Sequence, residues 1–193
     1  EQLSLLYDHT PCRADDTVLL FYQGNVLLKN ADQNGRFPLW HEIEGVCDDM
    51  PPAHLFTQGK RRFFFIRAEH VESAPEGFSF QSARAFRTLQ PEGDGFLLNA
   101  ANHLSAWYGA HRYCGVCAGM MRPAPVERAL ICEDCNHVIY PVISPAVIVA
   151  LTDGDRILLA RNANGVFRHL SLLAGYVEVG ETAEQAVQRE IME

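Results

Sequence analysis

Four cysteines arranged as two CxxC pairs constrain the fold of this chain more than any other feature. Cys114 and Cys117 form the first pair, Cys132 and Cys135 form the second, and 14 residues lie between them. Each CxxC makes a tight turn that directs two thiolates to a common point, so two pairs complete a tetrahedral Zn²⁺ site. A redox CxxC usually occurs as a single pair, and a disulfide framework involves more of a chain. We therefore predict a structural zinc ion whose four positions are all filled by protein, so that this metal does no chemistry.

The remaining cysteines and the histidines near the two pairs are better explained as ordinary surface or partly buried residues. His111 and His137 flank the two pairs and are alternative zinc ligands, but we expect them to be surface residues. Cys12 and Cys47 fit no pairing pattern and are expected to be half-buried thiols. This cysteine usage is typical of a reducing compartment, and we expect a cytoplasmic protein.

Composition narrows the class of protein. With 193 residues, 48% of them hydrophobic and 21% charged, the chain has room for one large or two small globular domains. Its net charge of −8 argues against a general nucleic-acid-binding surface, although a local basic patch can still hold a nucleotide or an RNA end. No apolar run reaches the length of a membrane span, and the first residues lack a secretory signal, so no membrane partner is expected.

The pattern of apolar residues predicts a β-rich N-terminal domain over residues 1–95. Residues 17–22 and 26–29 are expected to form a hairpin, and residues 63–66 are expected to form a buried strand. Residues 91–95, Pro-Glu-Gly-Asp-Gly, have the composition of a loop.

A connecting helix is predicted over residues 96–112, leading into the zinc ribbon at 113–140 and a last segment at 141–193. The apolar face of this helix should carry Phe96, Ala100, Leu104 and either Trp107 or Tyr108. In the last segment, residues 146–152 and 156–161 are expected to form a second hairpin. Both of its arms are apolar, so we expect it to be well buried. Residues 170–174 are then expected to form a short strand that leads to Gly175.

The C-terminal stretch GYVEVGETAEQAVQREIME has the residues of a glycine-bounded loop followed by a helix. Thr182 and Gln185 have the spacing of a capping box, which places the helix start near Ala183. The apolar stripe of this helix should consist of Ala183, Val187 and Ile191, while Glu190 and Glu193 share a neighbouring face. Carboxylates beside such a loop suit divalent cations that bridge phosphate oxygens. The alternative is an ordinary amphipathic helix with a solvated acidic face.

This spacing resembles the Nudix box, in which Gly, five residues, Glu, seven residues, Arg-Glu, an aliphatic residue, any residue and Glu-Glu follow one another. The matching residues are Gly175, Glu181, Arg189, Glu190, Ile191 and Glu193. The second glutamate of the closing pair falls after the last residue of the chain. We therefore expect the 193-residue polypeptide to have little or no activity by itself.

Upstream residues are similar to the NADH pyrophosphatase branch of the Nudix hydrolases, also known as NAD-capped RNA hydrolases. The matching residues are Trp107, Tyr113 to Cys117, Cys132, Cys135, Tyr140-Pro141, Leu158-Leu159 and Leu173 to Glu178. The chain departs from the branch at Val142, where many members carry Arg, and it ends before the Ser-Gln-Pro-Trp-rich segment that marks the branch. The resemblance implies an α+β fold with a β-rich N-terminal domain, a four-cysteine zinc ribbon and the start of an α/β/α Nudix fold.

The resemblance also implies a reaction and its site. The substrate would be NAD(H), cleaved to NMN(H) and AMP, and an NAD cap would be removed from RNA in the same way. Catalytic Mg²⁺ or Mn²⁺ would be held by the carbonyl of Ala174 and by Glu190 and Glu193, the two carboxylates implied to be catalytic. Gly175, Glu181 and Arg189 would be structural, with Glu181 paired to Arg189.

The sequence also suggests residues that would contact the substrate, and it leaves alternative functions open. Tyr140 and Tyr176 are candidates for stacking on a base or on nicotinamide, and in this branch they come from two subunits of a homodimer; the alternative for each is core packing. Arg84 is a candidate substrate contact, with a solvated arginine as the alternative. Rival functions are another Nudix specificity, such as ADP-ribose or diadenosine polyphosphate hydrolysis, and a non-catalytic zinc-ribbon binding module.

Overall fold

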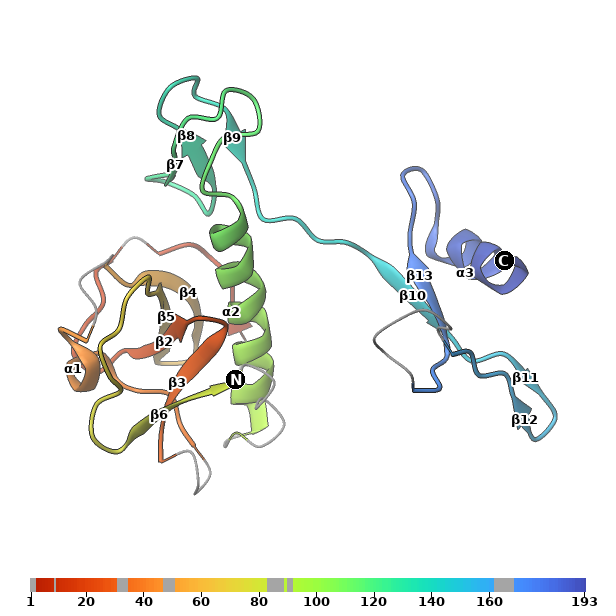
Figure 1. Cartoon of the computed structure of the whole chain (residues 1–193), viewed down its shortest axis with the longest axis horizontal. Coiled ribbons are helices and arrows are strands. Elements are labelled where there is room, and N and C mark those ends of the chain that lie inside the picture. The colour runs from red at the N-terminus through yellow and green to blue at the C-terminus, as the bar shows by residue number, and fades with distance from the viewer. Residues whose placement is uncertain are drawn as a thin grey trace. The chain divides into compact units, whose positions relative to one another are not determined.

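The computed structural model describes residues 3–8, 10–30, 35–46, 51–82, 89, 92–161 and 169–193. The chain divides into two compact units, residues 1–141 and residues 142–193 (Figure 1). The first unit contains a sheet, a long helix and the cysteine-rich ribbon. The second contains the segment that resembles the Nudix box.

The first unit is built on a six-stranded sheet with strand order β1-β4-β5-β2-β3-β6. The strands are β1 (Leu3–Ser4), β2 (Thr17–Tyr22), β3 (Asn25–Lys29), β4 (Ala53–Gln58), β5 (Arg61–Arg67) and β6 (Phe78–Ser82). Only the β2–β5 pair is parallel among these described strands. The predicted hairpin is confirmed: Gln23 and Gly24 form its two-residue turn with φ of 49° and 77°, the conformation that hairpin turns favour. The predicted strand at 63–66 is confirmed as the centre of β5.

Both faces of this sheet are buried, which explains the continuous apolar runs in β2 and β5. Leu19 and Phe65 point into a cluster that includes Leu97 and Leu98 of the long helix. Leu20 and Phe64, their neighbours in sequence, point into a second cluster that includes Ile43 of the short helix α1 (Trp40–Ile43). Alternate residues of one strand therefore serve two separate layers.

The long helix α2 (Glu92–Ala110) contacts β2 and β5 (Figure 1). It starts earlier than predicted, so the assignment of residues 91–95 to a loop is wrong for residues 92–95. The reason is tertiary: Asp94 is buried and its carboxylate accepts two 3.0 Å hydrogen bonds from the Arg61 guanidinium. The predicted apolar face is also wrong at Phe96, which is 64% exposed, whereas Leu97, Leu98 and Ala101 are buried.

The ribbon follows α2 and contains a three-stranded sheet of β7 (Met121–Pro123), β8 (Leu130–Cys132) and β9 (Val138–Ile139). Trp107, near the end of α2, packs in one buried cluster with Cys114, Met121, Leu130 and Cys132. The guanidinium of Arg128 donates to the carbonyl of Leu55 in β4. Helix and ribbon are therefore attached to the sheet by both apolar and polar contacts.

The described residues of the second unit form two short two-stranded sheets and one helix, α3 (Ala183–Met192). Strand β10 (Ala146–Val149) pairs with β13 (Leu173–Tyr176), and β11 (Thr152–Asp153) pairs with β12 (Arg156–Ile157). The predicted hairpin between 146–152 and 156–161 is therefore reduced to β11 and β12, and the strand predicted at 170–174 begins at Leu173.

The expectation that this hairpin is well buried is wrong. Ile148 is 72% exposed and Leu158 is 50% exposed. Two short sheets and a single helix have too few layers to cover both faces of their strands. The sequence pattern predicted the apolar character of both arms correctly. Burying them requires a second layer, which the described part of this unit does not supply.

The α+β fold class is confirmed, with a strand-rich first unit and a four-cysteine cluster. The boundary expected between residues 95 and 96 falls inside α2. Within the described ranges, no helix has both the length and the apolar character needed to cross a bilayer.

Candidate zinc centre and hydrolase site

The four cysteines of the two CxxC pairs come together in the ribbon. Their Sγ atoms all lie within 4.8 Å of one another. The Cys117–Cys132 and Cys117–Cys135 sulfur separations are 3.4 Å, and the Cys114–Cys135 separation is 3.7 Å. A tetrahedral Zn²⁺ with Zn–S bonds of about 2.3 Å places its sulfurs about 3.8 Å apart, so the donor set fits zinc.

Local backbone geometry explains how each CxxC presents its thiolates. The residue after each pair has a left-handed conformation, with φ of 61° at Ala118 and 58° at Asn136. Their amides donate to the carbonyls of Cys114 and Cys132, at 2.9 and 3.1 Å, which closes two equivalent turns. Backbone N–H groups of Cys117 and Val116 lower the pKa of the Cys114 thiol to about 7. At Cys114 the backbone therefore favours the thiolate that a metal binds.

The alternative ligands lie outside this cluster. His111 is tied to the end of α2, with Nδ1 2.7 Å from the carbonyl of Trp107. His137 is exposed and is not part of the four-residue cluster. Cys12 is half-buried, as expected, and burial raises the pKa of its thiol to about 12. Cys47 lies outside the described residues.

Helix α3 begins where its capping residues predict. Thr182 accepts a hydrogen bond from the amide of Gln185 at 3.2 Å, and the Gln185 side chain accepts one from the amide of Thr182 at 2.8 Å. The preceding turn requires φ of 86° at Gly180, a conformation that favours glycine. Of the predicted stripe, Val187 and Ile191 are half-buried but Ala183 is exposed, and Ala186 is the fully buried residue.

Arg189 is the centre of the hydrogen-bond network of this unit. Its Nε and Nη2 donate to the two carboxylate oxygens of Glu181 at 3.1 and 3.0 Å, so the expected Glu181–Arg189 pair is present. Nη2 also donates to the carbonyl of Tyr176 at 2.8 Å. The amide of Glu178 donates to Glu181 at 3.0 Å. One guanidinium thus joins strand β13, the glycine loop and α3.

This network holds the acidic side chains in defined places. Nη1 of Arg189 donates to Glu190 at 2.6 Å and to Glu193 at 3.2 Å. The ion pair with Arg189 and the amide of Glu178 lower the pKa of Glu181. The hydrogen bonds that Arg189 donates to Glu181, Glu190 and Glu193 raise the pKa of Arg189. The pair is therefore charged at neutral pH.

The Glu190 carboxylate lies directly against Gly175, the residue after Ala174. A Cβ at position 175 would overlap the Glu190 carboxyl group. The glycine therefore creates a cradle for this carboxylate at the end of β13. Glu190 is largely buried, with 16% of its side chain exposed, whereas Glu193 is 64% exposed.

A divalent cation would find oxygen donors here, which are the ligands that hard cations prefer. Glu190 and Glu193 approach the same Arg189 nitrogen, and Glu190 reaches the strand that carries Ala174. The described residues bring no third His, Cys, Asp or Glu side chain to these two in a metal-binding arrangement.

Of the three candidate substrate-binding residues, the two tyrosines are exposed to solvent. Tyr140 is 55% exposed, and its hydroxyl donates to Glu127 at 3.0 Å, which raises the pKa of Tyr140. Tyr176 is 67% exposed. Core packing is therefore not the environment of either ring in this structure. Arg84 lies outside the described residues.

One contact of this site escaped the sequence analysis. The backbone carbonyl of Tyr176 anchors Arg189, while the sequence pointed only to the ring of Tyr176. A carbonyl is common to every residue, so no side-chain pattern reports it. Ala186 was missed because a small residue adds little to an apolar pattern, although its position one turn before Glu190 is informative.

Comparisons with known proteins agree with this description. Residues 110–140 match the family described as the NADH pyrophosphatase zinc ribbon domain, and residues 142–193 match the NUDIX domain. The NAD-capped RNA hydrolase NudC of Pseudomonas syringae pv. syringae (strain B728a) is 45% identical over 141 residues, covering 72% of this chain and 49% of that protein. NAD-capped RNA hydrolase NudC of Escherichia coli (strain K12 / DH10B) is 50% identical over 93 residues, covering 47% of this chain and 35% of that protein.

The chain spans about half or less of the length of these curated relatives. The two matched domains adjoin, and they coincide with the cysteine cluster and with the network around Arg189. The chain therefore carries a zinc ribbon domain of the NADH pyrophosphatase type, followed by a NUDIX domain.

Proposed function

We propose that the complete gene product hydrolyses the pyrophosphate of NAD(H) to NMN(H) and AMP, and that it removes the NAD cap from RNA. The observation that carries this proposal is the Arg189 network, which holds Glu190 in the cradle at Gly175 beside Ala174. The zinc ribbon match and the names of the relatives support this specificity within the superfamily.

The reaction is attack of water on one phosphorus of the P–O–P linkage, with cleavage of the bond from that phosphorus to the bridging oxygen. The bridging oxygen leaves with the other phosphate, and the water oxygen stays on the attacked one. Bound Mg²⁺ or Mn²⁺ would stabilise the negative charge that develops on the phosphate oxygens. Glu190, Glu193 and the carbonyl of Ala174 would hold that cation, and Glu193 would also orient the water. Arg189 and Glu181 keep the helix and the loop in register.

Recognition of the dinucleotide is assigned to exposed side chains. Tyr140 and Tyr176 are both more than half exposed, so each ring has a face available for stacking on a base or on nicotinamide. We propose that two subunits of a homodimer supply these rings to one site, with Arg84 as a further contact.

The division of labour follows the sequence prediction. The β-rich part and the connecting helix, which begins at Glu92, form the N-terminal domain, the ribbon (113–140) is folded by zinc, and residues 141–193 belong to the catalytic domain. None of the described cysteines forms a disulfide, which supports the proposed reducing cytoplasmic location.

A comparison of substrates tests this proposal. The complete gene product is assayed with NADH, ADP-ribose, diadenosine polyphosphate and NAD-capped RNA, each with Mg²⁺ and with Mn²⁺. We expect the highest kcat/KM for NADH or the capped RNA. A preference for ADP-ribose or diadenosine polyphosphate would assign another Nudix specificity, and the absence of any turnover would favour a binding module.

A further inference from the structure

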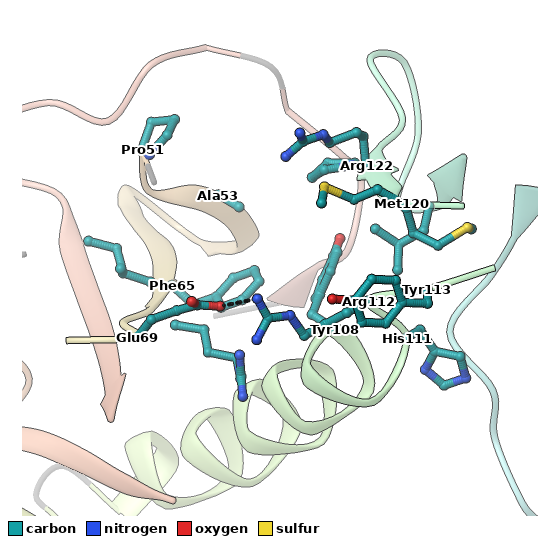
Figure 2. Close-up of a pocket in the computed structure, with 15 residues that line it drawn as sticks. Pro51, Ala53, Phe65, Glu69, Tyr108, His111, Arg112, Tyr113, Met120 and Arg122 are labelled. Carbon is teal, nitrogen blue, oxygen red and sulfur yellow. Dashed lines mark ion pairs between the residues drawn. The ribbon is translucent and has the colours of Figure 1, made fainter. Parts of the chain in front are cut away.

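A cavity of about 320 Å³ lies in the first unit, and none of the residues assigned above to the hydrolase site lines it. Its walls come from the Ala53–Phe65 end of the β4–β5 hairpin, from the last turn of α2 and from the first part of the ribbon (Figure 2). Three separate elements thus converge on one hollow, which is large enough for a nucleotide base and part of its sugar phosphate.

The charge of this cavity opposes that of the whole chain. Three arginines line it, Arg67, Arg112 and Arg122, against a single acidic residue, Glu69, although the net charge of the chain is −8. Arg112 pairs with Glu69 at 2.8 Å (Figure 2), and Arg122 pairs with Glu133 outside the cavity at 2.8 Å. Both of these arginines remain more than half exposed. A local positive potential is what an anionic ligand requires.

Arg67 is the cation available to such a ligand. In the described part of the chain it has no acidic partner and no side-chain hydrogen bond. Its guanidinium lies across α2 at Gly109, where an added Cβ would come within 2.7 Å of Nε. The missing side chain of Gly109 therefore lets the guanidinium pack against α2, while the Arg67 residue remains exposed and accessible to a ligand.

The remaining walls suit a flat aromatic group. Tyr108 rises from α2, and its hydroxyl points into the space between Ala53 and the ribbon residues Met120 and Arg122 (Figure 2). That hydroxyl has no hydrogen-bond partner among the described residues. Tyr113 also lines the cavity and is 64% exposed, so its ring is open to stacking. Apolar side chains such as Phe65 and Met121 complete the surface.

We propose that this cavity is a second nucleotide-binding site, which holds a base against Tyr113 and Tyr108 and a phosphate at Arg67. Aromatic side chains beside arginines are the common means of binding single-stranded nucleotides, because every base has a face to stack and every nucleotide has a phosphate. A free mononucleotide and one nucleotide of an RNA strand share this chemistry. The RNA source rests on the proposed function, in which the body of the capped RNA needs contacts beyond the cap.

The test is direct binding, with zinc bound and with neither Mg²⁺ nor Mn²⁺ added, so that no hydrolysis occurs. The probes are a fluorescein-labelled single-stranded adenylate RNA, followed by anisotropy, and AMP, followed by calorimetry. For whichever probe binds, we expect Arg67→Ala to weaken the affinity about tenfold. For RNA, it should also reduce the slope of log K against log salt by about 0.7, the value for one phosphate contact. Tyr108→Phe should weaken binding without changing that slope.

Lys60→Ala is the matched control. Lys60 is exposed on the turn at the opposite end of the β4–β5 hairpin, so the variant removes the same charge without touching the cavity. It should leave the affinity and the slope nearly unchanged. Retained thermal unfolding of each variant shows that the fold is intact.

The outcomes separate the two ligand sources. Binding of RNA alone assigns the site to an RNA strand, and comparable binding of AMP assigns it to free nucleotides; both support a nucleotide site if Arg67→Ala weakens them. Absence of binding by both probes, or equal effects of Arg67→Ala and Lys60→Ala, overturns the proposal. Because hydrolysis is not measured, failure to cleave NADH would remove the proposed function and leave this result unaffected.

Discussion

The carboxylate of Glu190 occupies the space that a Cβ at Gly175 would fill. Strand β13 carries the glycine and helix α3 carries the glutamate, so the missing side chain of one sets the position of the other. Arg189 completes this arrangement by binding Glu190 and the carbonyl of Tyr176 at the same time. The glycine of the motif is thus required for space, since its φ lies outside the left-handed region.

Gly175→Ala tests this relationship. The backbone at position 175 accepts alanine, so the strand should form while the methyl group displaces the Glu190 carboxylate. We expect kcat for NADH hydrolysis by the complete gene product to fall about 100-fold, the usual cost of misplacing a catalytic group by about 1 Å. Gly93→Ala is the control, because nothing lies within 4 Å of a Cβ added there. Equal activity of the two variants would contradict the role given to Gly175.

Arg189→Lys keeps the charge but removes the planar fork. Lysine cannot bind both oxygens of Glu181 and the carbonyl of Tyr176 at once. We expect a loss of about 10- to 100-fold in kcat/KM and a higher Mg²⁺ concentration for half-maximal rate, because the residues that orient metal ligands have effects of this size. Arg156→Lys, at an exposed pair with Asp153, should change neither quantity.

Zinc content and the fluorescence of Trp107 test the ribbon. Trp107 packs against Cys114 and Cys132, so loss of the metal should change its emission. Elemental analysis should give about one zinc per chain, and Cys132→Ser should lose it together with the Trp107 signal, since a structural site couples metal binding to folding. Cys12→Ser should retain both. Measurement in a Trp40→Phe background removes the second tryptophan. A Cys132→Ser variant that still holds one zinc would refute the site.

The buried side chain of His54 should make the free energy of unfolding depend on pH. Nδ1 of His54 accepts from the amide of Asp8 at 3.3 Å, so the proton lies on Nε2, which is 3.1 Å from Thr57. Burial lowers the pKa of His54 below its ordinary value. The unfolded chain therefore binds this proton more readily, and the contribution of His54 to stability is complete above about pH 6.5 and declines as the pH falls below it.

Urea unfolding at about pH 7.5 and about pH 5.5 measures this effect. We expect the wild type to lose stability between these values and His54→Gln to lose less. His41→Gln, at a half-exposed side chain, should behave as the wild type does. An identical pH response of His54→Gln and the wild type would assign the loss to other groups.

Local chemistry made some elements predictable. The Thr182–Gln185 capping box fixes the start of α3, and the spacing of the cysteines fixes which four sulfurs meet. Both depend on residues close in sequence, or on a ligand geometry that only one grouping satisfies. The turn at Gln23 and Gly24 belongs to the same class.

Where the structure differs from the sequence prediction, contacts between residues distant in sequence are the cause. Residues 92–95 have a loop composition, yet they are helical where Arg61 from a distant strand binds Asp94. Phe96 was placed on the buried face because it is apolar, but Leu97 and Leu98 are the residues that meet the sheet. The cavity joins Arg67, Tyr108 and Arg122 from a strand, a helix and the ribbon, and no sequence period connects them.

The most direct test of the hydrolase assignment compares Glu190→Gln with Glu184→Gln in the complete gene product. Both substitutions remove one carboxylate from α3, but Glu184 is exposed in its first turn, whereas Glu190 lies against Gly175. For Mg²⁺-dependent NADH cleavage we predict a loss of about 1000-fold in kcat with Glu190→Gln, equivalent to about 4 kcal/mol, and nearly full activity with Glu184→Gln. Retention of wild-type kcat by Glu190→Gln would contradict the account.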